Sequence, residues 1–303
     1  MYFPYLRGRQ SELLAIRTLL ENNRLGEQVI PVIEPIKPTA TFRKTMEAFK
    51  DHERELYIVS NPQVGEFQKE LDGSLEISKE FNELINNELF KPLTIITKEK
   101  DVTEDKEAYV MGNTDHIDWF KRGKITSDSS VVFVPDQTEF RRNLKNVSKR
   151  VLQANHFEEE NRNADYLSLF SKPFSSDHLH YQDEGYYGFS DYSIVGSGFM
   201  EGGFAPRAVA IHIVYLTEEN ELRIRHFTSE TNDDIANPAG KFNEALEKLV
   251  QAFKGDKRNE TLGLNQFIEH HKNGTYPGLG SVKQLSIMHH IELVGNYLRD
   301  EIK

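Results

Sequence analysis

The segment VIPVIEPIK, residues 29–37, ends an apolar run with a carboxylate and an ammonium group. Glu34 directly follows the apolar part of this run, so its side chain is expected to be half-buried. A carboxylate in that position needs a cationic partner or a raised pKa, and a raised pKa is what makes a general base. Glu34 is therefore either an acid/base residue or one half of an internal salt bridge. The cations available for such a bridge are Arg7, Arg9 and Lys37.

Polar side chains also follow most of the other predicted strands. In β/α folds the functional groups gather at the carboxyl ends of the strands. On this basis Asp136 is a second candidate acid/base residue, and Lys37 is a candidate to hold an anionic ligand. Arg7, which precedes the first predicted strand, is another candidate to hold the anion. Further candidate ligand-binding residues at strand ends are Asn61, Asp191 and Tyr192. Polar residues are also expected wherever a strand reaches water, so each position alone indicates little.

The sequence carries no recognised motif for a metal or a nucleotide. It has no cysteine and no HExxH motif, and His178 and His180 are expected to lie in a polar loop, so no metal site is predicted. The glycine-rich segment GSGFMEGGF, residues 196–204, matches neither GxGxxG nor GxxxxGK and is expected to form turns. No cofactor is therefore predicted.

Short apolar runs alternate with amphipathic helical patterns over the first two thirds of the chain. This alternation requires crossover connections and a parallel sheet, and continuously apolar strands are usually covered on both faces. The core strands are predicted at 29–34, 56–60, 93–97, 108–111, 131–134, 151–154, 186–195 and 209–216. Eight such strands predict an α/β fold that resembles a (β/α)8 barrel, with an open doubly wound sheet as the alternative.

The last third of the chain adds elements of another kind. Residues 222–227 are predicted to pair antiparallel with 209–216, which adds a hairpin to the barrel. Residues 172–206 are rich in Gly, Ser, Tyr, Phe and His and are predicted to form a loop-rich insertion. Three closing helices are predicted at 241–253, 264–271 and 282–302. The organisation predicted from these patterns is a single domain over residues 1–303.

The formal net charge of −11 bears on the partners of the protein. A negative surface repels nucleic acid unless a local basic stripe is present. The largest basic group, Arg141 to Arg150, fits a solvated helix face, so nucleic acid is not the expected partner. No run of apolar residues is long enough to cross a membrane, and the N-terminus lacks the pattern of a signal peptide. A cytoplasmic location without membrane contact is expected.

Four segments resemble the "beta protein" group of bacterial and phage proteins. FPYLRGRQSEL, residues 3–13, is similar to the opening of that group, and VIPVIEPIK is similar to its first strand, with Glu34 at the acidic position. FSDY at 189–192 is similar to a Gly-Asp-Tyr element, with serine in place of the glycine. MHHIELVGNYL at 288–298 is similar to the closing helix. The tryptophan-containing segment usual before that helix is replaced by TYPGLGSVK at 275–283.

The resemblance implies a β/α-barrel-like fold and an association with bacterial defence or mobile-element genes. It implies no established activity. A barrel would bring the N- and C-terminal elements together. The residues that would then share one rim are Arg7, Glu34, Asp191 and His290, which makes His290 a third catalytic candidate.

Two functions are consistent with these observations. The first is a recognition or scaffold subunit of a bacterial anti-phage defence or toxin-related system, which binds a protein partner, for example a nuclease-like one. The acidic composition, the aromatic residues of 172–206 and the lack of catalytic signatures favour it. The alternative is a barrel enzyme for a phosphorylated or nucleotide-like small molecule, with Glu34 or Asp136 as the acid/base. The oligomeric state is left open by the sequence.

Overall fold

The computed structural model describes residues 1–301 except 104–105, 124–129, 170, 201 and 203–205. Two compact units make up the chain. The first comprises Met1–Leu13, Glu27–Asn155 and Asp177–Tyr192. The second comprises Leu14–Gly26, His156–Ser176 and Ser193–Lys303. Helix α1, Gln10–Glu21, begins in the first unit and continues in the second.

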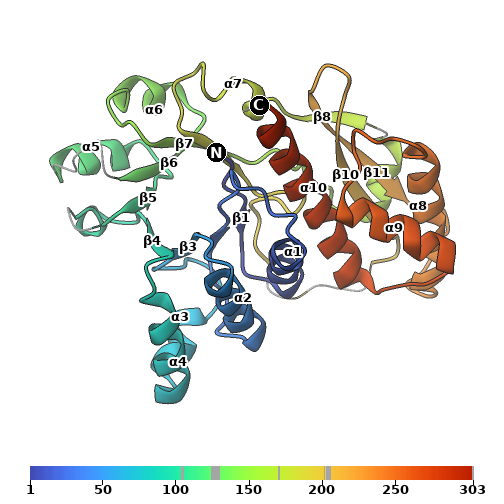
Figure 1. Cartoon of the computed structure of the whole chain (residues 1–303), viewed down its shortest axis with the longest axis horizontal. Coiled ribbons are helices and arrows are strands. Elements are labelled where there is room, and N and C mark those ends of the chain that lie inside the picture. The colour runs from blue at the N-terminus through green and yellow to red at the C-terminus, as the bar shows by residue number, and fades with distance from the viewer. Residues whose placement is uncertain (104–105, 124–129, 170, 201, 203–205, 302–303) are drawn as a thin grey trace. The chain divides into compact units, whose positions relative to one another are not determined.

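A parallel sheet forms the first unit, and its eight described strands follow one another almost in chain order. These strands are β1 (Tyr5–Leu6), β2 (Val32–Ile33), β3 (Leu56–Val59), β4 (Phe90–Ile95), β5 (Ala108–Val110), β6 (Val131–Pro135), β7 (Arg150–Ala154) and β9 (Gly188–Asp191). Tyr2 makes parallel bridges to both Val29 and Phe189, which brings the two edge strands together. The sheet is therefore nearly closed into a barrel (Figure 1).

Short helices connect the barrel strands. They are α2 (Ala40–Asp51), α3 (Phe67–Asp72), α4 (Leu75–Ile85), α5 (Asp115–Arg122), α6 (Thr138–Asn143) and α7 (Asp177–His180), with the 3-10 helix η1 (Glu99–Asp101). Helix α2 illustrates why they form. The hydroxyl of Thr39 accepts a hydrogen bond from Phe42 N at 3.1 Å, which caps the first turn. Phe42, Met46 and Phe49 then repeat on one buried face of the helix.

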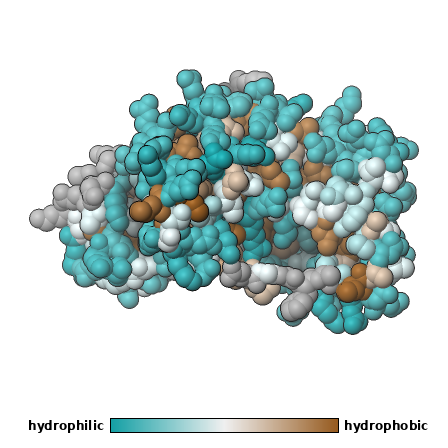
Figure 2. Space-filling view, turned by 90° about the horizontal axis from the view of Figure 1, so that it is seen from below, coloured by the Kyte–Doolittle hydropathy of each residue, from teal (hydrophilic) through white to brown (hydrophobic). Residues whose placement is uncertain are grey.

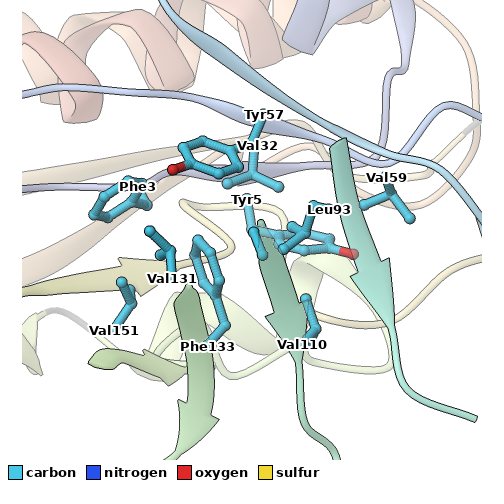
Figure 3. Close-up of a cluster of buried hydrophobic side chains, with 11 residues drawn as sticks. Phe3, Tyr5, Val32, Tyr57, Val59, Leu93, Val110, Val131, Phe133 and Val151 are labelled. Atoms are coloured by element: carbon cyan, nitrogen blue, oxygen red, sulfur yellow. The ribbon is translucent and has the colours of Figure 1, made fainter. Parts of the chain in front are cut away.

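Aromatic and β-branched side chains fill the interior of the barrel (Figure 3). The ring of Phe3 packs edge-on against Tyr57 and Phe133, with centroid separations of 5.9 and 5.5 Å. Val32 and Leu93, both fully buried, fill the space between strands in the same cluster. Edge-to-face packing of this kind is favourable beyond the area it buries. The barrel is therefore held by a packed core, as expected of small closed parallel sheets.

The second unit contains an antiparallel sheet of three described strands, in the order β10-β11-β8, with helices around it. Its elements are η2 (Asn163–Ser168), β8 (Ser171–Ser175), β10 (Ala210–Leu216), β11 (Leu222–Thr228), α8 (Pro238–Ala252), α9 (Leu262–Asn273) and α10 (Leu279–Glu301). Every residue of α10 from Leu285 to Gly295 is buried. A helix buried on all sides belongs to a core, and α10 is accordingly the centre of this unit.

The predicted α/β barrel-like fold with an added hairpin and C-terminal helices is confirmed. The predicted strand 209–216 lies in the antiparallel sheet, as β10, and not in the barrel. The N-terminal strand β1 takes its place, and two residues are too few to show a periodic pattern. Within 172–206 the structure forms most of β8, helix α7 and strand β9, besides loops. None of the described helices is long and apolar enough to cross a membrane.

His289 of α10 lies at the centre of a buried hydrogen-bonded chain in the second unit. Its Nε2 is 2.6 Å from Val214 O, and its Nδ1 is 2.7 Å from Thr261 Oγ1. A carbonyl oxygen only accepts, so Nε2 carries the proton and Nδ1 accepts from the Thr261 hydroxyl. Thr261 also caps helix α9 by accepting from Leu264 N. Burial lowers the pKa of His289 to about 4, so the ring is neutral at neutral pH.

This burial predicts a loss of stability in mild acid. Between a native pKa of about 4 and an unfolded value of 6.5, the unfolded chain binds a proton that the folded protein does not. The stabilisation is present above 6.5 and is lost as the pH falls toward 4. We expect His289 alone to lower the free energy of unfolding by about 2 kcal/mol between about pH 7.5 and pH 5. Urea unfolding of wild type and of His289→Gln at both pH values measures this loss. If the free energy of unfolding fell by the same amount in both proteins, the prediction would be contradicted.

Candidate functional site

Glu34 lies just beyond β2, and the structure buries its carboxylate completely. Its Oε2 accepts hydrogen bonds from the Tyr5 hydroxyl at 2.8 Å and from Arg7 Nη1. Its Oε1 accepts from the backbone N–H of Gln63 at 2.7 Å. Both carboxylate oxygens are therefore engaged, and the charge is balanced by the Arg7 guanidinium, as in the salt-bridge interpretation of the sequence.

Two tight loops bring these groups together. Gly8, with a φ of +65°, makes the turn after Arg7, and a Cβ there would lie 3.3 Å from the backbone oxygen of Glu34. Gly65, with a φ of +71°, lies so close to Ile36 that a Cβ would be 2.4 Å from its carbonyl oxygen. Only glycine fits such left-handed and close positions without strain. The loops after β1, β2 and β3 are thus packed against one another around Glu34.

Two tyrosine rings flank the guanidinium of Arg7. Its central carbon lies 5.6 Å from the ring centres of both Tyr5 and Tyr192, and these rings lie 5.1 Å apart. Burial, reinforced by the charge of Glu34, raises the pKa of Tyr5 well above its usual value. Burial likewise raises the pKa of Tyr192, with Arg7 opposing and Glu34 adding to the shift. Both phenols therefore stay protonated at neutral pH.

Gln153 and Ser190 bring two further polar groups to the interior of the barrel. They lie opposite each other on the neighbouring strands β7 and β9. Val151, two residues before Gln153, is part of the barrel core, and Tyr192, two residues after Ser190, packs against that core. Because side chains alternate along a strand, Gln153 and Ser190 face inward. Neither Gln153 Nε2 nor Ser190 Oγ, both buried, has a hydrogen-bond partner among the described residues.

We call the carboxyl end of the barrel, with Arg7, Glu34, Gln153, Ser190 and Tyr192, the barrel mouth. Buried polar groups are almost always hydrogen-bonded in folded proteins, so Gln153 Nε2 and Ser190 Oγ are expected to bind water or a ligand. The barrel mouth thus combines the buried ion pair of Arg7 and Glu34 with the polar groups of Gln153 and Ser190, which have no hydrogen-bond partner among the described residues. Its chemistry suits binding through hydrogen bonds more than proton abstraction by Glu34, whose two oxygens already accept three hydrogen bonds.

Asp191 lies on the other face of its strand. It is buried and accepts a hydrogen bond from the Tyr2 hydroxyl at 2.9 Å. The Tyr2 ring stacks on Phe189, two residues before Asp191, so these side chains share the outer face of the barrel. Burial, together with the charge of Asp191, raises the pKa of Tyr2 well above its usual value. The structure therefore does not place Asp191 beside Arg7 and Glu34.

The other predicted site residues of the first unit also lie apart from the barrel mouth or have internal partners. The side-chain amide of Asn61 donates from Nδ2 to Ile95 O at 2.8 Å and accepts from Ile95 N at Oδ1 at 2.9 Å, and so ties the end of β3 to β4. Asp136 accepts from Arg141 at 2.6 Å in an exposed pair. Lys37 forms an ion pair with Glu70, with an N–O distance of 3.8 Å. These contacts account for the positions of the three side chains within the fold.

His290 belongs to the second unit, where it is fully buried. Its Nδ1 is 2.9 Å from the Ser193 hydroxyl, and its ring packs edge-on against Phe174 at 5.1 Å.

The predicted helix face from Arg141 to Arg150 does not form, because α6 ends at Asn143 and Arg150 begins β7. Arg150 is buried over the ring of Tyr186 and donates to Gly185 O at 2.9 Å. No group of three His, Asp or Glu side chains in the described part of the chain could hold a metal ion.

Tyr5, Gln153 and Ser190 were missed by the sequence reasoning. Each lies two residues from another inward-facing side chain, namely Phe3, Tyr192 or Val151, so counting every second residue finds them once the strands are known. That counting required the strand β1 and the pairing of β7 with β9, which only the structure supplies. Gln63 contributes only its backbone N–H to Glu34, so the type of its side chain could not have indicated this role.

Together these features define an α/β protein with a nearly closed parallel barrel and a polar site at the carboxyl end of its strands. No family model matches the chain, and no curated protein matches it significantly in sequence. The resemblance to the "beta protein" group therefore rests on the four segments quoted above.

Proposed function

We propose that the protein is a non-enzymatic recognition subunit that binds a protein partner through the barrel mouth. One observation carries the proposal: Glu34 is locked by three hydrogen bonds, while Gln153 and Ser190 keep buried polar groups without a partner among the described residues. The backbone or side-chain oxygens of a partner would satisfy these groups. A role in bacterial defence or a toxin-related system is the setting that the four-segment resemblance suggests.

Surface character is consistent with such a role but does not locate a partner. The face in Figure 2 is mostly hydrophilic, with small apolar groups. The aromatic residues of 172–206, expected to be exposed for protein contacts, are mostly buried: Phe174, Tyr181, Tyr186 and Phe189 are each less than a tenth exposed. Among the described aromatic residues of this segment, Tyr187 is the most open, at 40%. The proposal therefore relies on the barrel mouth and not on aromatic loops.

A native pull-down tests the proposal. We expect the tagged full-length chain to retain a protein partner in stoichiometric amount from cells that carry its neighbouring genes. A Gln153→Leu, Ser190→Ala double variant should bind that partner at least about tenfold more weakly, since it loses hydrogen bonds made in a buried site. The free energy of unfolding of the double variant should equal or exceed that of wild type, because both changes remove buried polar groups that lack hydrogen-bond partners among the described residues.

The control is Gln182→Leu, which changes an exposed glutamine of the same unit and should leave binding unchanged. Equal retention of the partner by the double variant would exclude the barrel mouth as the interface. Recovery of a stoichiometric small molecule without any protein partner would contradict the proposal and support a barrel enzyme.

A further inference from the structure

The second unit holds a pocket of about 440 Å³ beside the end of β11. Its apolar wall is formed by Phe227 of β11, Ala252 of α8 and Leu167 of η2. Leu167 is 51% exposed although it is a large apolar side chain, and it stands at this pocket. A hollow of this size with an apolar wall accommodates the body of a small organic molecule.

Thr228, the last residue of β11, brings a polar group to the same pocket. The residue is only 2% exposed, and its Oγ1 is buried without a hydrogen-bond partner among the described residues. An unpaired buried hydroxyl is unfavourable by comparison with one that is hydrogen-bonded. Valine would fill the same volume without that penalty, so the hydroxyl indicates a ligand that accepts its hydrogen bond.

Lys248 of α8 supplies a positive charge next to this hydroxyl. Its ammonium donates to the backbone oxygen of Thr228 at 2.9 Å and pairs with Glu230 at 3.1 Å. The Glu230 side chain is 74% exposed, so this ion pair is screened by water and readily exchanged. An ammonium has three N–H groups, and a ligand can accept from one of them.

His226 completes the polar side of the pocket as a neutral group. Burial lowers its pKa to about 4, with the nearby Lys172 ammonium adding to the shift. Its Nδ1 lies 2.7 Å from that of His212, and Tyr166 stacks on its ring at 4.6 Å. The imidazole is therefore fixed in place and uncharged at neutral pH. One ammonium and one hydroxyl suit a monoanion, whereas a dianion would lack sufficient positive charge in a protein of net charge −11.

We propose that this pocket binds a small carboxylic acid with an apolar body, whose carboxylate accepts hydrogen bonds from Thr228 Oγ1 and Lys248 Nζ. The apolar body would pack against Phe227, Ala252 and Leu167. This site is independent of partner binding at the barrel mouth, so either proposal can fail without the other.

Titration of the full-length protein with benzoate tests the site, with binding measured by calorimetry or ligand-observed NMR. Benzamide, which has the same shape without the charge, is the ligand control. We expect benzoate to bind wild type, and Thr228→Val and Lys248→Met each to weaken it about tenfold, the effect of losing one charge-assisted hydrogen bond. Lys254→Met, an exposed lysine just beyond α8, should bind as wild type does.

Thr228→Val separates a loss of binding from a loss of folding. Because it removes an unpartnered hydroxyl, its thermal midpoint without ligand should equal or exceed that of wild type while its affinity for benzoate falls. Absence of benzoate binding to wild type, equal affinity for benzamide, or unchanged affinity in both pocket variants would each overturn the proposal.

Discussion

Replacing Glu34 by alanine is expected to lower the free energy of unfolding by about 3 to 5 kcal/mol, the effect of breaking a buried ion pair from one side. The change leaves the Arg7 guanidinium, whose side chain is only 13% exposed, without its counter-charge. It also removes the acceptor of the Tyr5 hydroxyl and of the Gln63 N–H. Urea unfolding followed by circular dichroism measures the loss.

The double variant Glu34→Leu, Arg7→Met is the matched control. Replacing both members of a buried ion pair by apolar residues of similar volume is often nearly neutral. We therefore expect it to be more stable than Glu34→Ala, in spite of carrying two changes. Glu34→Gln should fall between them, because it keeps an acceptor for Gln63 N–H but not the charge. If the double variant is the least stable of the three, the ion pair is not what holds the loops around the barrel mouth.

A second large effect is expected at Gly263, in the first turn of α9. A Cβ on this residue would lie 2.4 Å from the carbonyl oxygen of Leu285 and 2.8 Å from the backbone N of His289. Both atoms belong to the backbone of α10, which cannot rotate away as a side chain can. Gly263→Ala is expected to lower the free energy of unfolding by about 3 kcal/mol through overpacking. The gain in helix propensity, about 1 kcal/mol, is too small to offset this.

Gly280→Ala, in the first turn of α10, provides the control. Beyond its own turn of the helix, no atom of the described residues lies within 4 Å of a Cβ at that position. The same substitution should therefore be neutral or stabilise the protein by up to about 1 kcal/mol. Thermal unfolding of the two variants side by side measures the contrast. Equal midpoints would show that α9 and α10 separate readily, and that the close approach at Gly263 does not limit stability.

The sequence was most informative where periodicity was long and strong. The apolar runs of β3, β5, β6 and β7 and the stripes of α8, α9 and α10 predicted those elements close to their observed positions. It was least informative where an element is short. The strand β1 has two residues, so its pattern cannot be distinguished from a coil, and β10 was assigned to the barrel in its place.

The candidate site shows the same division. The apolar run before Glu34 predicted a half-buried carboxylate, which the structure buries completely, and Arg7 was among the three cations named for it. Sequence spacing could not choose Arg7 over Arg9 or Lys37, because that choice depends on which side chain faces inward beside Glu34. Asp191 looked equivalent to Glu34 as a polar strand end. It faces outward to Tyr2 because it directly follows Ser190, which faces inward, and successive side chains of a strand point to opposite faces.

By itself, then, the sequence determined the α/β class, the partial burial of Glu34 and the extent of the long helices, because those follow from local hydrophobic periodicity. Only the tertiary structure decided the closure of the barrel by Tyr2, the pairing of Arg7 with Glu34 and the meeting of Gln153 with Ser190. Each of these joins residues far apart in the chain. Their meeting depends on strand order and register, which local patterns do not encode.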